Sequence, residues 1–241
     1  MFSSKKGISL YCFSPLVMIV TFVIEIILAI YTLIKSRKEK SDVGIVLILV
    51  FLALFQLSEY KICDNVNILE WSKFGMFSIT LLPVLGIYLI YRLNKKSYLL
   101  KFSSIIAIFF LSYFIFNPRS VNEAACTGNY IIFDINSTIH ALYGYYYFGF
   151  LLLGIWEAAR GIKEHNEEIR KALKWFIVGY LSFILPLTVV YIVMPITRSG
   201  VASIMCGFAV IFAFILTIKI APIYHKYVKM ERREKNEILW F

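Results

Sequence analysis

Seven long apolar runs divide this chain, and polar or charged residues bound each of them. The runs cover residues 11–34, 43–60, 71–91, 102–116, 139–159, 173–194 and 201–221. A helix needs about 20 apolar residues to cross the hydrocarbon of a bilayer, and the runs come close to that length. Helices are expected because they satisfy every backbone amide without water, and the runs lack the alternation of membrane-barrel strands. The sequence therefore predicts an all-α integral membrane protein, a bundle of seven transmembrane helices.

Composition supports a membrane protein over a soluble one. Hydrophobic residues make up 60% of the chain, and the mean hydropathy is +0.75. Soluble domains are about 45–50% apolar. The net charge of +10 would suggest a nucleic-acid ligand in a soluble protein. Here the orientation of a membrane protein explains it, so we expect the lipid bilayer as partner, no nucleic acid, and a multi-pass location in the cell membrane.

The basic residues alternate between rich and poor loops, which predicts the orientation. On one side lie Lys35, Arg37, Lys38, Lys40, Arg92, Lys95, Lys96, Lys101, Arg160, Lys163, Arg170, Lys171, Lys174, Lys226, Lys229, Arg232, Arg233 and Lys235. On the other side lie Lys5, Lys6, Lys61, Lys73, Arg119 and Arg198. Cytoplasmic loops carry the excess of Lys and Arg. We therefore expect the N-terminus outside and the C-terminus in the cytoplasm.

The first apolar run is expected to be a retained helix rather than a cleaved signal peptide. Its apolar stretch, residues 15–34, is longer than the 7–15 residues of a signal-peptide core, and no small-residue cleavage site follows it. We expect one seven-helix transmembrane domain at residues 1–222 and a short basic cytoplasmic tail at 223–241.

Three polar residues lie inside the first two runs. Glu25 is about ten residues from the cytoplasmic end of its run, or roughly 15 Å deep at about 1.5 Å per residue. A carboxyl at that depth needs a partner or a proton. It is either a ligand contact or titrating group, or a neutral group hydrogen-bonded between helices. Gln56 and Glu59 share a helical face in the outer half of the second run, where Glu59 either points inward or reaches the outer interface.

A stripe of polar rings marks the outer end of the fifth run. His140, Tyr143 and Tyr147 follow helical spacing, although tyrosines 145–147 also fit an aromatic belt at the membrane surface. The functional hypothesis is an outward-opening pocket with Glu25 beneath it. The predicted ligand-binding residues are Glu25, Gln56, Glu59, His140, Tyr143 and Tyr147.

Three of the four cysteines lie on or near the outer face, where disulfides form. Cys63 and Cys126 occupy adjacent outer loops and are the preferred pair, with Cys12 as the rival partner. Cys206 belongs to a helical stripe of small residues in the last run, which is typical of close helix packing.

The chain offers no set of residues for the chemistry of other seven-helix proteins. Seven-helix zinc hydrolases need several membrane histidines, whereas His140, His165 and His225 fall on different sides of the predicted membrane. A retinal protein needs a lysine in the middle of its seventh helix, and Lys219 lies at the cytoplasmic end of this one. We therefore expect no enzyme activity, metal or cofactor.

Several short motifs of the chain have a counterpart in a known family. They are residues 56–59 (Gln-Leu-Ser-Glu), 71–75 (Trp-Ser-Lys-Phe-Gly), 79–83 (Ile-Thr-Leu-Leu-Pro), 143–147 (Tyr-Gly-Tyr-Tyr-Tyr), 174–175 (Lys-Trp) and 185–186 (Leu-Pro). In these motifs the chain resembles the N-terminal seven-helix sensor region of bacterial histidine kinases and cyclases. Only about twenty residues follow the seventh run, so no output domain accompanies it. The resemblance implies a stand-alone sensor that signals through a separate cytoplasmic or membrane partner.

These expectations leave two functions from different classes open. The first is a receptor-like or sensor-like protein with an outward-facing site for a small molecule or lipid. The alternative is a small transporter or proton-coupled permease that uses Glu25.

Overall fold

The computed structural model describes residues 14–36, 43–94, 97–127, 130–164 and 166–238. Nearly all of this part of the chain is helical. The elements are α1 (Pro15–Ser36), α2 (Val43–Cys63), α3 (Ile68–Asn94), α4 (Tyr98–Phe116), β1 (Glu123–Cys126), β2 (Ile131–Asp134), α5 (Ser137–Glu164), α6 (Glu167–Val193), the 3-10 turn η2 (Pro195–Gly200), α7 (Val201–Ile215), the π-helical turn η3 (Leu216–Ile220) and α8 (Ala221–Ile238).

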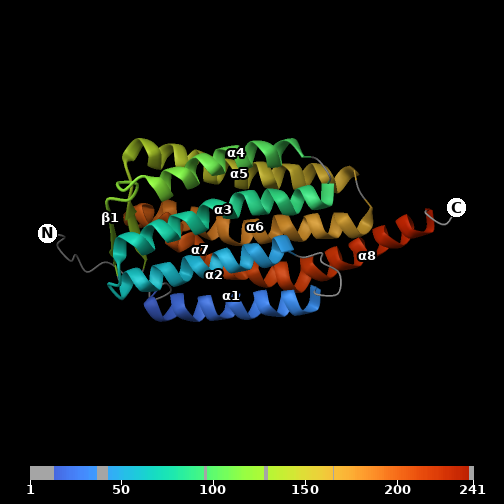
Figure 1. Cartoon of the computed structure of the whole chain (residues 1–241), viewed down its shortest axis with the longest axis horizontal. Helices are drawn as coiled ribbons and strands as arrows, with labels where there is room; N and C mark the ends of the chain where they lie inside the picture. Colours follow the sequence, from blue (N-terminus) through green and yellow to red (C-terminus); the bar gives the residue numbers. More distant parts are fainter. Residues whose placement is uncertain (1–13, 37–42, 95–96, 128–129, 165, 239–241) are drawn as a thin grey trace.

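The long helices lie side by side along one axis (Figure 1). We call the end that carries the β-hairpin the hairpin end, and the end beyond which α8 projects the α8 end. Helix α2 packs between α1 and α3, and α3 also contacts α4 and α5. Helix α6 joins α5 to α7, and α7 contacts α1 and α2, so the bundle closes on itself.

The distribution of side chains is that of a protein in lipid. Large apolar residues such as Ile105, Ile108 and Phe109 of α4 face outward and are more than half exposed. Polar residues such as Glu25 and Thr80 are fully enclosed. A soluble protein rarely exposes contiguous apolar surface of this extent. The fold is therefore an all-α bundle with the surface of a multi-pass membrane protein.

Six helical segments are long and apolar enough to cross a membrane, including the continuous stretch Thr197–Met230 that contains α7. Helix α5 is not among these six, although it has 28 residues. Its tyrosines at 143 and 145–147, its glycines, and the charged residues of its last two turns lower its mean hydropathy.

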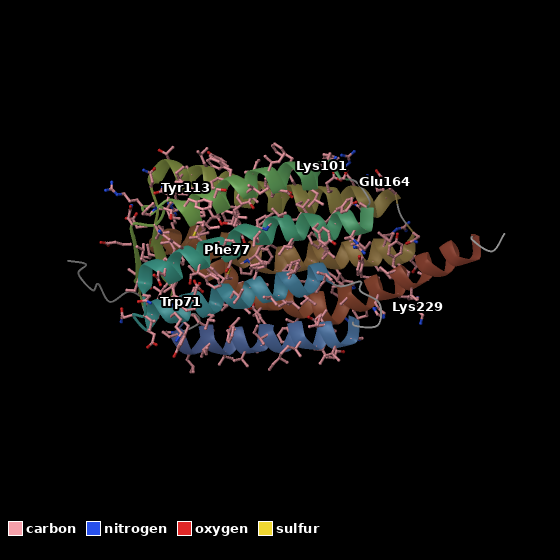
Figure 2. The ribbon with its side chains drawn as sticks, viewed as in Figure 1. Trp71, Phe77, Lys101, Tyr113, Glu164 and Lys229 are labelled. Atoms are coloured by element: carbon pink, nitrogen blue, oxygen red, sulfur yellow. A yellow bond between two sulfur atoms is a disulfide. The ribbon has the colours of Figure 1, made fainter. Side chains whose placement is uncertain are left out.

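Charged and aromatic residues concentrate at the two ends of the bundle. Figure 2 shows Lys101, Glu164 and Lys229 toward the α8 end, and Trp71 and Tyr113 toward the hairpin end. The middle of the bundle between them is the apolar band that a bilayer would cover.

A short β-hairpin covers one end of the bundle, and the sequence did not predict it. Strands β1 and β2 pair antiparallel, with Cys126 opposite Ile131. A disulfide joins Cys126 to Cys63 at the end of α2, which is the preferred pairing. Cys206 is free and buried, and Cys12 lies outside the described residues.

We predict that removing this disulfide destabilises the protein by about 2–4 kcal/mol, because the bridge closes a long loop. The bonded cysteines are 63 residues apart. Thermal unfolding of the purified Cys63→Ser/Cys126→Ser variant should begin at a lower temperature than that of the wild type. A reductant should lower the wild-type transition and leave that of the variant unchanged. An equal shift in both proteins would contradict the prediction.

Candidate functional site

A cavity of about 80 Å³ opens at the hairpin end of the bundle. Three helices, the hairpin and the turn before α7 enclose it. Its lining residues are Met76, Ile79, Phe133, Ile135, His140, Tyr143, Gly144, Tyr147, Phe148, Arg198, Ser199, Val201, Ala202 and Met205. The walls are mainly apolar and aromatic with a few polar groups, which is the usual make-up of small-molecule sites.

The hairpin forms the roof of this cavity, and the sequence fixes it at three points. The disulfide ties β1 to α2. The backbone N–H of Ile131 donates to Ser203 Oγ over 3.2 Å, which ties β2 to α7. Gly200 allows the ring of Tyr130 to lie against the backbone, since a Cβ there would stand 2.1 Å from the ring. The roof is therefore held to both α2 and α7.

The mouth of the cavity carries its two basic side chains. His140 and Arg198 line the cavity and are both exposed. Arg198 is positioned by Tyr191, because its Nε donates to the Tyr191 carbonyl over 3.3 Å and its guanidinium lies 4.9 Å from the ring centroid. Basic groups at the mouth of an apolar cavity favour a ligand with an acidic or electron-rich end.

The floor of the cavity is built from tyrosines that α3 holds in place. The hydroxyl of Tyr143 lies 3.1 Å from Thr80 Oγ1, and the hydroxyl of Tyr146 donates to the Thr80 carbonyl over 2.5 Å. Thr80 lies three residues before Pro83, where the missing N–H and the ring of proline disturb the helical hydrogen bonds. The tyrosines of α5 therefore dock onto α3 one turn before Pro83.

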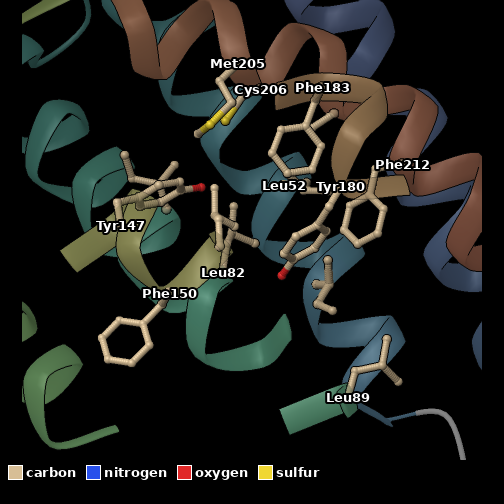
Figure 3. Packing of buried hydrophobic residues seen from close by; sticks show 14 of the residues in the cluster. Leu52, Leu82, Leu89, Tyr147, Phe150, Tyr180, Phe183, Met205, Cys206 and Phe212 are labelled. Carbon is tan, nitrogen blue, oxygen red and sulfur yellow. The ribbon is translucent and has the colours of Figure 1, made fainter. Parts of the chain in front are cut away.

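A second, smaller cavity of about 20 Å³ continues from the first toward the centre of the bundle. Tyr147 and Met205 belong to both cavities. Figure 3 shows Tyr147, Met205, Cys206 and Tyr180 around this packed centre. Tyr180 fits closely against α3, because a Cβ at Gly86 would stand 1.8 Å from its hydroxyl. Aromatic packing therefore ends the cavity inside the bundle.

A separate group of polar residues lies between α1, α2 and α7. Glu25, Gln56 and Glu59 have exposed fractions of only 0%, 2% and 1%. Both carboxyl oxygens of Glu25, Oε1 of Glu59 and Nε2 of Gln56 are buried without a hydrogen-bond partner. Because such groups cost free energy when unpaired, native structures contain few of them.

Helix geometry brings the two carboxyls toward each other. Side chains tilt toward the N-terminus of their own helix, and α1 and α2 are antiparallel neighbours (Figure 1), so Glu25 and Glu59 lean together. The two carboxyls are close enough to interact electrostatically, and Cys206 of α7 interacts with both. Ser203 lies beside Glu59. Since Ser203 also accepts a hydrogen bond from the N–H of Ile131, it connects the hairpin to the surroundings of Glu59.

The structure thus divides the predicted ligand-binding residues into two sets. His140, Tyr143 and Tyr147 line the cavity. Glu25, Gln56 and Glu59 are not among its lining residues, so the structure does not bring the six residues together in one cavity wall. The first turns of α7 separate the sets: Val201, Ala202 and Met205 face the cavity, whereas Ser203 and Cys206 lie next to the carboxyls.

Two alternatives from the sequence are also decided. Glu59 points inward rather than reaching the outer interface, because the hairpin and α7 cover the end of α2. The aromatic belt fits Tyr145, which is 79% exposed, but not Tyr146 and Tyr147, which are buried.

Sequence reasoning missed Arg198 and Ser203 as members of these sites. Arg198 counted only as an outer basic residue, and Ser203 carried no signal of its own. Helical spacing from Met205 and Cys206 would place Arg198 and Ser203 on different faces. It would not show which residues each of them contacts. In the described part of the chain, no three His, Cys, Asp or Glu side chains are grouped to hold a metal ion.

We predict opposite effects on stability for two buried glutamates. Glu25→Leu should keep or raise the free energy of unfolding, by up to about 1–3 kcal/mol, because it removes an unpaired polar group at similar volume. Glu157→Leu is the matched control and should lower it, because Glu157 accepts hydrogen bonds from Tyr98 and from Arg160. Thermal unfolding of the purified variants makes the comparison. An equal loss of stability in both would mean that Glu25 has a partner.

No protein-family model matches the chain, and no curated protein matches it in sequence.

Proposed function

We propose that this protein is a receptor-like or sensor-like protein of the cell membrane that crosses the bilayer seven times. Its N-terminus would lie outside and its C-terminus in the cytoplasm. The cavity under the hairpin would bind a small molecule, or one end of a lipid, from the outer side, and a separate partner would carry the signal onward.

The position of α5 supports a seventh span. Its 28 residues correspond to about 42 Å of helix, and it runs beside α6 over the length of the bundle (Figure 1). Helix α5 connects the hairpin end of α4 to the α8 end of α6. A bilayer that α4 and α6 cross would therefore be crossed by α5 as well. The tyrosines that make α5 less apolar are largely buried, so lipid would not meet them.

The orientation is supported by the contrast between the two ends. The hairpin end carries the disulfide, a bond that persists in oxidising compartments such as the outer side of the membrane. Basic residues prevail at the α8 end and continue through α8 in Arg232, Arg233 and Lys235, as they do on the cytoplasmic side of membrane proteins.

The cavity itself carries the proposal. It opens at the hairpin end, narrows at Tyr147 and Met205, and ends against Tyr180 and Phe183. Neither this cavity nor its continuation has Glu25 in its wall. A binding site closed toward the centre suits a receptor better than a conduit.

The hairpin roof would connect ligand binding in the cavity to the packing of α1, α2 and α7. A ligand that shifts the hairpin would alter the hydrogen bond from Ile131 to Ser203, and through Ser203 the surroundings of Glu59. Because Glu59 already has an unpaired oxygen between α1, α2 and α7, small changes there would bias how these helices pack.

A proton-coupled permease remains the second candidate, on the strength of one observation. Both oxygens of Glu25 lack a partner at the midpoint of α1. An unpaired ionisable group at the middle of a bilayer is a frequent mark of proton relays.

We predict the topology from fusions to a reporter that is active only in the cytoplasm. Fusions on the proposed inner side should give signal: after Lys40, Lys96, Glu168 and Glu237. Fusions after Asn65 and Asn122 should be silent, because these residues belong to the hairpin end. Signal at either of the latter, or silence at Glu168, would refute the proposed arrangement.

We predict that filling the cavity abolishes ligand binding without harming the fold. A Cβ at Gly144 would meet no atom within 4 Å, and this residue lines the cavity, so Gly144→Leu should project into empty space. Gly149→Leu is the matched control, because Gly149 has the same open surroundings on the same helix and lies outside the cavity. Both should fold, since leucine favours helices more than glycine does.

Benzoate, a small aromatic acid, is the probe for this test, because it matches the apolar walls and the basic mouth. Saturation-transfer NMR should detect its binding to the wild type and to Gly149→Leu, and at least tenfold weaker binding to Gly144→Leu. Equal binding to all three proteins, or binding to none of them, would contradict the proposed site.

A further inference from the structure

Two buried threonines behave unlike the other hydroxyl residues of the bundle. Inside helices, serine and threonine usually satisfy their hydroxyls by donating to a carbonyl three or four residues earlier. The residues that do so here are Ser58, Ser72, Ser78, Thr80, Ser103, Ser182 and Thr188. Thr32 and Thr217 are buried, with exposed fractions of 2% and 3%, and neither hydroxyl has a partner.

The two threonines line the same depression, which lies between α1 and the η3–α8 segment toward the α8 end. This depression continues into a groove of about 420 Å³ on the outside of the bundle. We call the two together the α1–α8 groove. Its lining residues are Ile27, Leu28, Tyr31, Thr32, Lys35, Thr217, Ile218, Ala221, Pro222 and His225.

The groove has the same helical pattern on each wall. Residues 27, 28, 31, 32 and 35 form one face of α1, and residues 217, 218, 221, 222 and 225 repeat that spacing on the opposite wall. The helices run in the same direction (Figure 1), so the first wall runs from Ile27 to the basic Lys35, and the second runs from Thr217 and Ile218 to the basic His225. The groove therefore has a polarity along the bundle axis.

The π-helical turn shapes the second wall. Pro222 has no N–H for the carbonyl of Ile218, and its ring would clash with that carbonyl in a regular helix. The turn before it is widened into η3, in which the N–H of Ala221 bonds to the carbonyl of Leu216. Such turns occur often at functional sites. Here η3 carries Thr217 and Ile218 into the groove.

The polar groups at the basic end suit an anion. Lys35 is an ammonium donor that lies 3.4 Å from the Tyr31 hydroxyl, and Thr32 and Thr217 line the same depression. Among the described residues that line the groove there is no Asp or Glu. A phosphate would supply the acceptor oxygens that these donors lack.

We propose that the α1–α8 groove binds one anionic phospholipid from the leaflet at the α8 end. Its phosphate lies against Lys35 and the two threonine hydroxyls, and its acyl chain follows Ile27, Leu28 and Ile218 toward the bilayer centre. The basic end of the groove lies where a headgroup would be, and the apolar end faces hydrocarbon. This proposal rests on membrane embedding alone and does not depend on the outer cavity.

Native mass spectrometry of the purified protein with phosphatidylglycerol and with phosphatidylcholine tests this site. The wild type should retain phosphatidylglycerol at least tenfold more strongly than phosphatidylcholine. Thr32→Val/Thr217→Val, which removes both hydroxyls at constant shape, should lose at least tenfold in affinity, and Lys35→Met about fivefold. Lys35→Arg should bind as the wild type does.

Matched controls separate this site from general effects of charge and folding. Lys61→Met removes a lysine that also lies over a tyrosine, Tyr60, but at the hairpin end, and Thr188→Val removes a back-bonded hydroxyl. Both should bind phosphatidylglycerol as the wild type does, and all variants should keep the wild-type unfolding temperature within a few degrees. Equal retention of the two lipids, undiminished binding by the threonine variant, or saturation by inorganic phosphate alone would overturn the proposal. Failure of benzoate to bind would leave it intact.

Discussion

The cost of leaving a polar group unpaired away from water organises this bundle. Within lipid, helices satisfy the backbone, and side-chain hydroxyls have only nearby carbonyls to bond to. Seven of the described serines and threonines inside helices do this. Tyr146 bonds to a carbonyl of α3 close to a proline. Against that background the unpaired groups stand out: apart from Asn94 Oδ1, they gather at Glu25 and its neighbours and at Thr32 with Thr217.

Helix α7 separates the cavity at the hairpin end from the buried carboxyls and contacts both of them. One of its faces closes the cavity with Ala202 and Met205, and the other holds Ser203 and Cys206 against the carboxyls. The hairpin rests on the same turn of this helix. The hairpin and the surroundings of Glu59 are therefore connected through one turn of α7, although Glu59 does not line the cavity.

The sequence was most informative for features that depend on residues close together along the chain. Apolar runs located the helices to within a few residues, because hydrocarbon thickness sets their length. The depth of Glu25 followed from counting along one helix, and the two outer cysteines could be paired because their loops adjoin.

The hairpin escaped prediction because each of its strands has only four residues. Glu59 lies one turn from the end of α2, and only the elements packed over that end decide whether it is buried. Tertiary packing likewise decides that α7 lies between the residues of the cavity and the buried carboxyls, and counting along single helices does not reveal this.

Pro222, which widens the turn η3, also sets how α8 is rotated about its own axis. A π-helical turn holds one residue more than an α-helical turn, and one residue of an α-helix corresponds to about 100° of rotation. Helix α8 is therefore turned about its own axis relative to a regular continuation of α7. In this setting Lys226 reaches Glu168 of α6, with 2.7 Å between Nζ and Oε1. If the turn tightened to a regular α-helix, α8 would rotate about its own axis, and a different side of α8 would face α6.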